Sequence, residues 1–229
     1  MKKARERSAD RVRRALIVLN SDLRDCRACH MAGLLDEVES IPIARDPEPD
    51  APAPRILLVG QAPGLRATLL DRPFAGAAGE KLRDWFEQGG IPRDDFYRAI
   101  HFAAVTRCYP GRLPGAKGDR VPSPREQALC RPWLDELFAI IRPRIVLHVG
   151  LLAIRAFLGP VKSLTAVVGT AVVRDGVLYI PLPHPSGVSR WLNAPTNVAA
   201  VDRAMAILRE GLQGLVHDRG GSSESADGS

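Results

Sequence analysis

The chain has 229 residues, of which 45% are hydrophobic, and it carries a formal net charge of +6. This length and composition suit one buried core, so we expect a single domain over residues 1–219 and a disordered tail over residues 220–229. No run approaches the roughly 20 apolar residues that a membrane-spanning helix needs, which excludes a membrane-spanning protein. The basic N-terminus lacks the apolar core of a secretory signal, so we expect a cytoplasmic protein.

The positive charge is concentrated in two segments. Residues 1–30 hold nine Lys and Arg against four Asp and Glu, and residues 105–131 hold six against two. Such segments suit a polyanion, because each cation placed near a phosphate releases counterions. The alternative is a solvated basic face that has no partner.

The first half of the chain predicts helices that alternate with short apolar strands. The strand signal is a continuous apolar run that ends at a glycine, and the helix signal is apolar residues at a spacing of three and four. The expected elements are a helix over 8–25, a loop over 46–54, a strand over 55–60, a helix over 78–88 and a strand over 100–106.

The second half continues this alternation. Ser123 is a good N-cap for the helix that follows it, and Asp175-Gly176 is typical of a tight hairpin turn. The expected elements are a mobile Gly- and Pro-rich loop over 111–124, a helix over 124–141, a strand over 144–150, a helix over 151–158, a hairpin over 170–182 and a closing helix over 197–212.

Strands that alternate with helices predict an α/β sandwich with a largely parallel sheet. In such sheets a ligand binds outside the carboxyl ends of the strands. Three unusual segments directly follow expected strands, at residues 60–64, 107–111 and 184–187. We therefore expect them to converge on one cleft.

The four cysteines are arranged as a Cys26-x-x-Cys29 pair, then Cys108 and Cys130. Together they can complete a four-sulfur shell for Zn²⁺ or for an iron–sulfur cluster. Two disulfides are the first alternative, although disulfides rarely persist in a reducing cytosol. The second alternative is that Cys108 and Cys130 are unrelated buried thiols.

Three features of the expected cleft have a structural and a functional interpretation. The loop 60–64 brings backbone N–H groups close to a ligand, or it is an ordinary strand-to-helix turn. Phe74 stacks on a planar base, or it is a core anchor. His184, which lies between prolines that hold the backbone extended, donates to developing negative charge, or it is structural.

In their order and spacing these segments resemble the uracil-DNA glycosylase superfamily, closest to its iron–sulfur-containing families 4 and 5. The resemblance covers roughly residues 20–212. It rests on Cys-x-x-Cys, Gly-x-Ala-Pro-Gly after a strand, Arg-Pro-Phe-x-Gly-x-x-Gly, Arg-Cys after a strand, Pro-x-x-x-Glu-x-x-x-Cys, the Ile-x-Pro-x-x-Val strand and His-Pro-Ser. It implies a three-layer α/β/α sandwich around a mostly parallel, four-stranded sheet.

The resemblance also implies roles for individual residues. Cys26, Cys29, Cys108 and Cys130 would hold a [4Fe–4S] cluster, with zinc as the less favoured occupant. Gly60, Gln61 and Ala62 would line the water and base pocket, Phe74 would stack on a flipped base, and His184 would donate a hydrogen bond to the base carbonyl O2. Ser186, Gly187 and Val188 would press into the duplex, and Arg190 would contact phosphate.

Two positions depart from the family pattern. Gln61 stands where family 4 has Glu, and a Gln side chain orients water but cannot act as a base. Ala104 stands where the family has an Asn that reads the base edge. Thr106 lies two residues on, on the same face of a regular strand, and is the first candidate to substitute; His101 is the second.

The resemblance implies a monofunctional DNA glycosylase of base excision repair, a hydrolase that removes uracil, and with it other deaminated bases, from single- or double-stranded DNA. We expect it to act as a monomer, nucleoid-associated in a bacterial cytoplasm. The first alternative is a catalytically weak or inactive nucleic-acid-binding protein on the same fold, which the residues at 61 and 104 motivate. The second is a zinc-containing α/β hydrolase that acts on a nucleotide.

Overall fold

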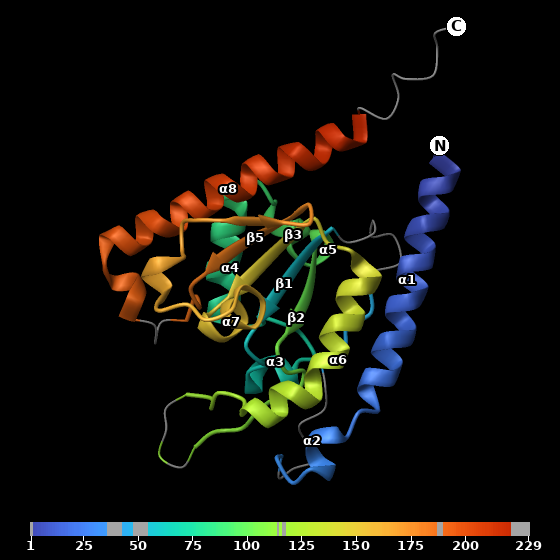
Figure 1. The fold of residues 1–229 in the computed structure, drawn as a ribbon, viewed down its shortest axis with the longest axis vertical. Coiled ribbons are helices and arrows are strands. Elements are labelled where there is room, and N and C mark those ends of the chain that lie inside the picture. Colours follow the sequence, from blue (N-terminus) through green and yellow to red (C-terminus); the bar gives the residue numbers. More distant parts are fainter. Residues whose placement is uncertain are drawn as a thin grey trace, which may run out of the picture.

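The structure is a computed structural model, and it describes residues 2–35, 43–47, 55–113, 115, 118–186 and 190–220 (Figure 1). The expected tail lies outside the described residues, apart from Gly220, which ends the last helix. Most of the expected loop over 46–54 also lies outside them. Among the described residues, no helix combines the length and the apolar character needed to span a membrane.

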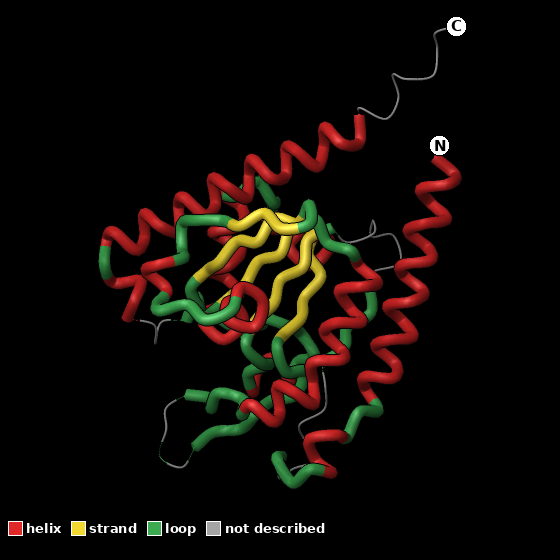
Figure 2. The backbone as a smooth tube through the Cα atoms, viewed as in Figure 1, coloured by secondary structure: helices red, strands yellow, loops and turns green. Residues whose placement is uncertain are grey.

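One twisted sheet forms the centre of the molecule (Figure 2). Its strands are β1 (Ile56–Gly60), β2 (Ile100–Ala104), β3 (Ile145–Val149), β4 (Val172–Arg174) and β5 (Val177–Leu182), in the order β2-β1-β3-β5-β4. The first four strands in that order are parallel, and β4 pairs antiparallel with β5. The expected number of four strands is therefore wrong, because β4 extends the sheet beyond its parallel part. β4 and β5 form the hairpin that was expected over residues 170–182, with Asp175-Gly176 between its strands, so that part of the prediction is confirmed.

Five of the described helices fall close to the expected segments, whereas the short helices over 28–31, 65–69 and 96–99 were not predicted. The described helices are α1 (Lys2–Arg24), α2 (Ala28–Met31), α3 (Leu65–Leu69), α4 (Ala77–Gln88), α5 (Phe96–Ala99), α6 (Pro124–Ile141), α7 (Leu151–Leu158) and α8 (Pro195–Gly220), with 3-10 turns η1 (Arg93–Asp95), η2 (Leu164–Ala166) and η3 (Arg190–Asn193). α6 has the predicted bounds, because Ser123 and Glu126 form a reciprocal capping box and Pro124 occupies the first helical turn.

The two faces of the sheet bury separate apolar clusters. Ile56 and Leu58 of β1 face a core formed with α4 and α8, while Leu57 and Val59 face a core formed with α1, α6 and α7. Alternate residues of a strand point to opposite faces, which explains this division. The fold is therefore the expected three-layer α/β/α sandwich with a mostly parallel sheet (Figure 1).

The N-terminal helix lies along α6 on one side of the sandwich (Figure 1). Leu16 and Leu19 of α1 share a buried cluster with Leu134 and Leu137 of α6. This contact brings the two basic segments of the sequence, residues 1–30 and 105–131, next to each other. It also brings the Cys26-x-x-Cys29 turn, which follows α1, close to the start of α6.

Candidate functional site

A cavity of about 580 Å³ lies where the parallel strands end. Its wall includes a residue at or just after the carboxyl end of each parallel strand, namely Gly60, Ala104, Gly150 and His184. Ligands of open α/β sheets bind at this edge. The segments 60–64, 107–111 and 184–187 all contribute to the wall, so the three segments that were expected to converge do so.

The loop 60–64 forms one side of this cavity. Its backbone is tied to the segment after β2, because Gly60 O accepts a hydrogen bond from the Val105 N–H (3.0 Å) and Gln61 O accepts one from the Thr106 N–H (3.2 Å). Gly60, Gln61 and Ala62 all line the cavity. The loop is therefore a fixed wall of the site and leads into α3.

Phe74 lines the cavity from the turn before α4. Its backbone has a φ of 53°, which is uncommon for a residue with a side chain. The ring packs against Phe102 of β2, with the ring centroids 6.1 Å apart, and is only partly buried. Phe74 therefore packs against the core and also belongs to the cavity wall, and its stacking on a base stays a prediction.

His184 lines the same cavity from the segment after β5. The Ser186 N–H donates to its Nδ1 (3.2 Å), so a neutral imidazole carries its proton on Nε2. Burial lowers the pKa of His184 below its ordinary value of 6.5, and the negative charge of Asp119 opposes this shift only in part. The imidazole is exposed to the cavity. In the neutral tautomer that this contact favours, His184 carries a donor on Nε2, and the residue lines the cavity.

The structure separates Ala104, where the base-reading amide is missing, from the two residues that were considered as its substitutes. Ala104 lines the cavity, but neither Thr106 nor His101 is among the described residues of its wall. β2 ends at Ala104, so the strand alternation that was expected to place Thr106 beside Ala104 does not continue to it. Thr106 is buried, with 4% of its surface exposed, and its hydroxyl has no hydrogen-bond partner among the described residues. Thr106 is therefore not among the described residues of the cavity wall, and its role as a replacement for the missing amide stays a prediction.

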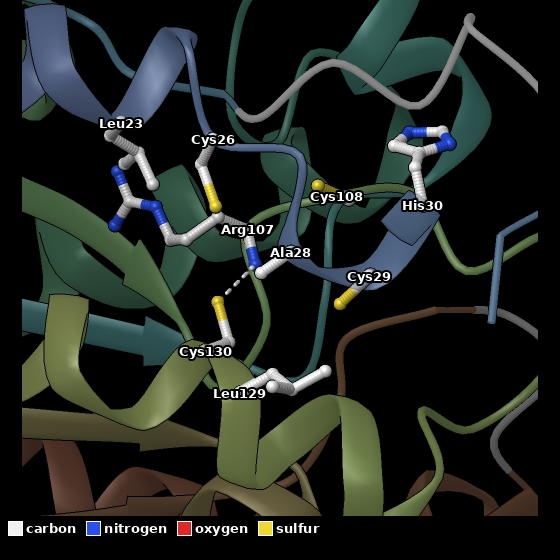
Figure 3. Close-up of a pocket in the computed structure, with 9 residues that line it drawn as sticks. All are labelled: Leu23, Cys26, Ala28, Cys29, His30, Arg107, Cys108, Leu129 and Cys130. Atoms are coloured by element: carbon white, nitrogen blue, oxygen red, sulfur yellow. Dashed lines mark hydrogen bonds between the residues drawn. The ribbon is translucent and has the colours of Figure 1, made fainter. Parts of the chain in front are cut away.

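All four cysteines line one small cavity near the start of α6 (Figure 3). Cys26 and Cys29 come from the turn after α1 and from α2, Cys108 follows β2, and Cys130 lies in α6. Figure 3 shows the four sulfur atoms around a common space, with the Arg107 N–H donating to Cys130 Sγ at 3.3 Å. The cysteines are free, which argues against the two-disulfide alternative.

The thiols influence one another electrostatically. Burial raises the pKa of Cys108 to about 12, with smaller contributions from the neighbouring Cys130, Cys29 and Cys26. Burial likewise raises the pKa of Cys130 to about 11. As the side chains stand, no group of three or more Cys, His, Asp or Glu residues in the described part of the chain is close enough to hold a single metal ion.

Two arginines of the second basic segment have structural partners. The guanidinium of Arg107 is buried and donates to Ile43 O at 2.8 and 3.2 Å. Arg120 donates to both carboxylate oxygens of Glu126, at 2.7 and 2.8 Å, and to Leu34 O. These two cations therefore hold the N-terminal segment and the loop before α6 in place and do not serve a solvent-exposed polyanion surface.

The expected duplex-contacting residues are only partly described. Ser186 lines the cavity, and Arg190 is exposed at the start of η3. Gly187 and Val188 lie outside the described residues.

The cavity also contains residues that the sequence did not identify. Arg66 of α3 and the pair Arg112 and Asp119 line it. Arg112 and Asp119 form an isolated antiparallel bridge that folds the loop between β2 and α6 toward the cavity. The only sequence signal for them is the length of the segment between Cys108 and Cys130.

Comparison with known proteins finds a match to the uracil DNA glycosylase superfamily over residues 47–209. The type-4 uracil-DNA glycosylase of Thermotoga maritima is 34% identical over 138 residues, which cover 59% of this chain and 67% of that protein. The type-4 protein of Pyrobaculum aerophilum is 30% identical over 103 residues, which cover 45% and 47%. A type-5 uracil-DNA glycosylase of the same organism is 29% identical over 168 residues, which cover 68% and 70%.

The family match covers all five strands of the described sheet and all the residues named above in the wall of the large cavity. It does not include Cys26 and Cys29, which precede it. The motifs that carried the resemblance, including Gly-Gln-Ala-Pro-Gly and His-Pro-Ser, meet at one edge of the sheet. The chain belongs to the uracil DNA glycosylase superfamily.

Proposed function

We propose that this chain is a monofunctional uracil-DNA glycosylase, a hydrolase that removes uracil from DNA in base excision repair. One observation carries the proposal: the ring of Phe74 and the imidazole of His184 lie in the wall of one cavity at the carboxyl ends of the parallel strands. Membership of the superfamily and the type-4 relatives support the substrate class. The cavity, at about 580 Å³, has room for an extruded nucleobase.

The base would enter the cavity by flipping out of the helix. Flipping costs a few kcal/mol and is cheapest at a mispair, such as uracil opposite guanine. The exposed part of the Phe74 ring offers a stacking surface, and stacking on an aromatic ring contributes about 1–3 kcal/mol. The backbone of Gln61 and Ala62 would form the pocket wall beside the base.

His184 would act on the leaving base. As the bond between N1 and C1′ breaks, its electron pair stays with uracil and negative charge builds on O2. The Nε2–H of the neutral imidazole donates to that oxygen, while the Ser186 N–H fixes the ring through Nδ1. A donor aimed at developing charge is worth about 2.7–4 kcal/mol.

Water completes the reaction by attack on the cation-like C1′. A bifunctional enzyme would use a lysine amine in place of water. No lysine lines the cavity among the residues that the structure describes. This supports a hydrolytic enzyme, whose product is an abasic site in an intact strand.

The cysteines would hold a [4Fe–4S] cluster, with Cys26, Cys29, Cys108 and Cys130 as its ligands. The donor set fits, because four thiols from separate segments line one cavity and their sulfur atoms surround a common space (Figure 3). When bound, the cluster supplies a covalent link among these segments. The chain around it holds the α1–α2 turn against the start of α6, next to the base pocket.

The DNA-contacting surface would surround the cavity mouth. We propose that Ser186, Gly187 and Val188 press into the duplex and that Arg190 contacts phosphate. The exposed position of Arg190 supports the last of these roles. We further propose that the chain acts as a monomer at the nucleoid of a bacterial cytoplasm, where this substrate lies.

A panel of oligonucleotides tests the proposed activity. Single- and double-stranded substrates would carry uracil, hypoxanthine, xanthine or a thymine mispair, and abasic sites would be counted after alkaline cleavage. We expect uracil to be released fastest and other deaminated bases more slowly, since Ala104 leaves the pocket without the amide that reads the base edge. Strand cleavage before alkali treatment, or release of thymine at the rate of uracil, would contradict the proposal.

A further inference from the structure

The pocket described above has a donor for the leaving base but lacks an obvious group for the attacking water. Gln61 lines the cavity, yet an amide side chain cannot accept a proton from water at neutral pH. The loop 60–64 contains no carboxylate. A carboxylate that handles the water must therefore come from another segment.

Asp119 is a carboxylate in the wall of this cavity. It is brought there by the turn between β2 and α6, where Arg112 bridges to Asp119 and the Arg120 N–H donates to Gly111 O at 2.9 Å. One carboxylate oxygen, Oδ1, accepts hydrogen bonds from Tyr109 Oη (3.1 Å) and Arg112 Nε (3.4 Å). These contacts fix the direction of the side chain.

The second oxygen, Oδ2, lies against the loop that carries Gln61. It is 3.2 Å from the position that a Cβ on Gly64 would occupy, so the absence of a side chain at Gly64 makes room for it. The Asp119 side chain is 32% exposed, which leaves it accessible to water. Its charge also reaches His184, where it acts to raise the pKa of the imidazole.

We propose that Asp119 positions the attacking water and accepts its proton; this inference rests on the proposed glycosylase function. In this step a water oxygen forms the bond to C1′ of the sugar, whose bond to N1 has broken with its electron pair on uracil. The proton of the water passes to Asp119 Oδ2 and from there to solvent. His184 faces the departing base, so the two residues act on opposite products of the broken bond.

Charge favours this division of roles. The departing uracil is an anion, and a carboxylate beside it would raise its energy, whereas the sugar becomes cation-like and a carboxylate beside it lowers the energy of that state. In this proposal Asp119 therefore acts on the sugar and the water, and His184 acts on the base. Gln61 is left to orient the same water through its amide.

An Asp119→Asn variant tests the inference under single-turnover conditions with uracil-containing duplex. General base catalysis is typically worth about 100-fold or more, so we expect the cleavage rate to fall at least tenfold. The dissociation constant for the same DNA should stay within about threefold, because Asn keeps the shape of the side chain and loses only its charge. A variant that cleaves at the wild-type rate would overturn the inference.

Two further variants separate this role from a structural one. Tyr109→Phe removes one of the two hydrogen bonds that orient Oδ1 but keeps the carboxylate and its contact with Arg112, so we expect a clearly smaller loss than that of Asp119→Asn. A Tyr109→Phe loss as large as that of Asp119→Asn would show that Asp119 merely holds the loop. Gln61→Glu, added to Asp119→Asn, should restore part of the rate by supplying a carboxylate from the facing loop; a double variant as slow as Asp119→Asn contradicts the water-handling role.

The activity of the wild-type chain separates a failure of the proposed glycosylase function from a failure of the role assigned to Asp119. If it produces no abasic sites, the glycosylase function itself is wrong. If it is active while Asp119→Asn is equally active, only the assignment of Asp119 fails.

Discussion

The backbone of Phe74 lies directly on Gly79 of α4. A Cβ built on Gly79 would stand 1.7 Å from Phe74 O and 2.7 Å from the Phe74 carbonyl carbon. Phe74 therefore keeps its left-handed backbone only because residue 79 has no side chain. A second contact holds the same turn, because Tyr97 Oη donates to Pro73 O at 2.8 Å.

Gly79→Ala should displace Phe74 and with it the stacking surface. Since stacking contributes about 1–3 kcal/mol, we expect kcat/KM for uracil-containing DNA to fall by roughly 5- to 150-fold. Gly214→Ala, in α8, is the matched control, because a Cβ there meets no atom within 4 Å. Equal activities of the two variants would show that the position of Phe74 does not depend on Gly79.

His184→Ala should slow cleavage far more than it weakens binding. Removing a donor that acts on developing charge costs about 2.7–4 kcal/mol, which corresponds to a 100- to 1000-fold loss in the single-turnover rate. The dissociation constant for uracil-containing DNA should change little, because the interaction strengthens mainly as the bond breaks. Fluorescence anisotropy and product formation on the same oligonucleotide measure the two quantities, and an unchanged rate would make His184 a structural residue.

Cys108→Ser should remove the cluster. We expect the purified wild-type chain to be brown with an absorption band near 400 nm, and the variant to lack the band and to unfold at a lower temperature. His30→Ala is the control, because His30 lines the same small cavity but its ring extends away from Cys29 Sγ (Figure 3). A colourless wild-type chain that contains zinc would contradict the iron–sulfur assignment.

His148 should make the fold sensitive to acid. It is fully buried in β3, its ring stacks on Tyr179 at 5.7 Å, and neither ring nitrogen has a hydrogen-bond partner among the described residues. Burial lowers its pKa from 6.5 to about 3. Below pH 6.5 the unfolded chain therefore binds a proton that the native chain does not bind, so stability is complete above that pH and falls as the pH drops toward 3.

Between pH 7 and pH 5 this linkage costs about 2 kcal/mol of unfolding free energy. His148→Leu removes the titrating group and leaves an apolar side chain in an apolar site. Between pH 7 and pH 5 the variant should therefore lose about 2 kcal/mol less unfolding free energy than the wild type. Urea denaturation of both chains at the two pH values measures the difference. If the unfolding free energy of both chains falls by the same amount, His148 is not the cause of the acid sensitivity.

The sequence predicted elements best where local signals and burial agree. α6 begins at Pro124 as expected because Ser123 and Glu126 form a capping box, and β1 is a continuous apolar run that is buried on both faces. α1 begins six residues earlier than predicted, at Lys2, because its first turns are polar and carry no apolar periodicity. α3 has only five residues, too few for a helical pattern to emerge.

The candidate site was predictable to the extent that it follows strand ends. Gly60, Ala104 and His184 meet because the carboxyl ends of parallel strands share one edge. Strand alternation could not place Thr106, because β2 stops at Ala104. Asp119 was not predictable, since its place in the cavity depends on the bridge to Arg112, and neither strand pattern nor helix period encodes that loop.

The most direct test of the account is product formation with the enzyme in excess over a duplex that carries one uracil opposite guanine. We predict that every bound uracil is converted to an abasic site with the strand intact, at a rate that His184→Ala lowers at least 100-fold. If the duplex is fully bound but no abasic product forms, the glycosylase proposal is contradicted. The chain would then be a nucleic-acid-binding protein that does not cleave the N-glycosyl bond.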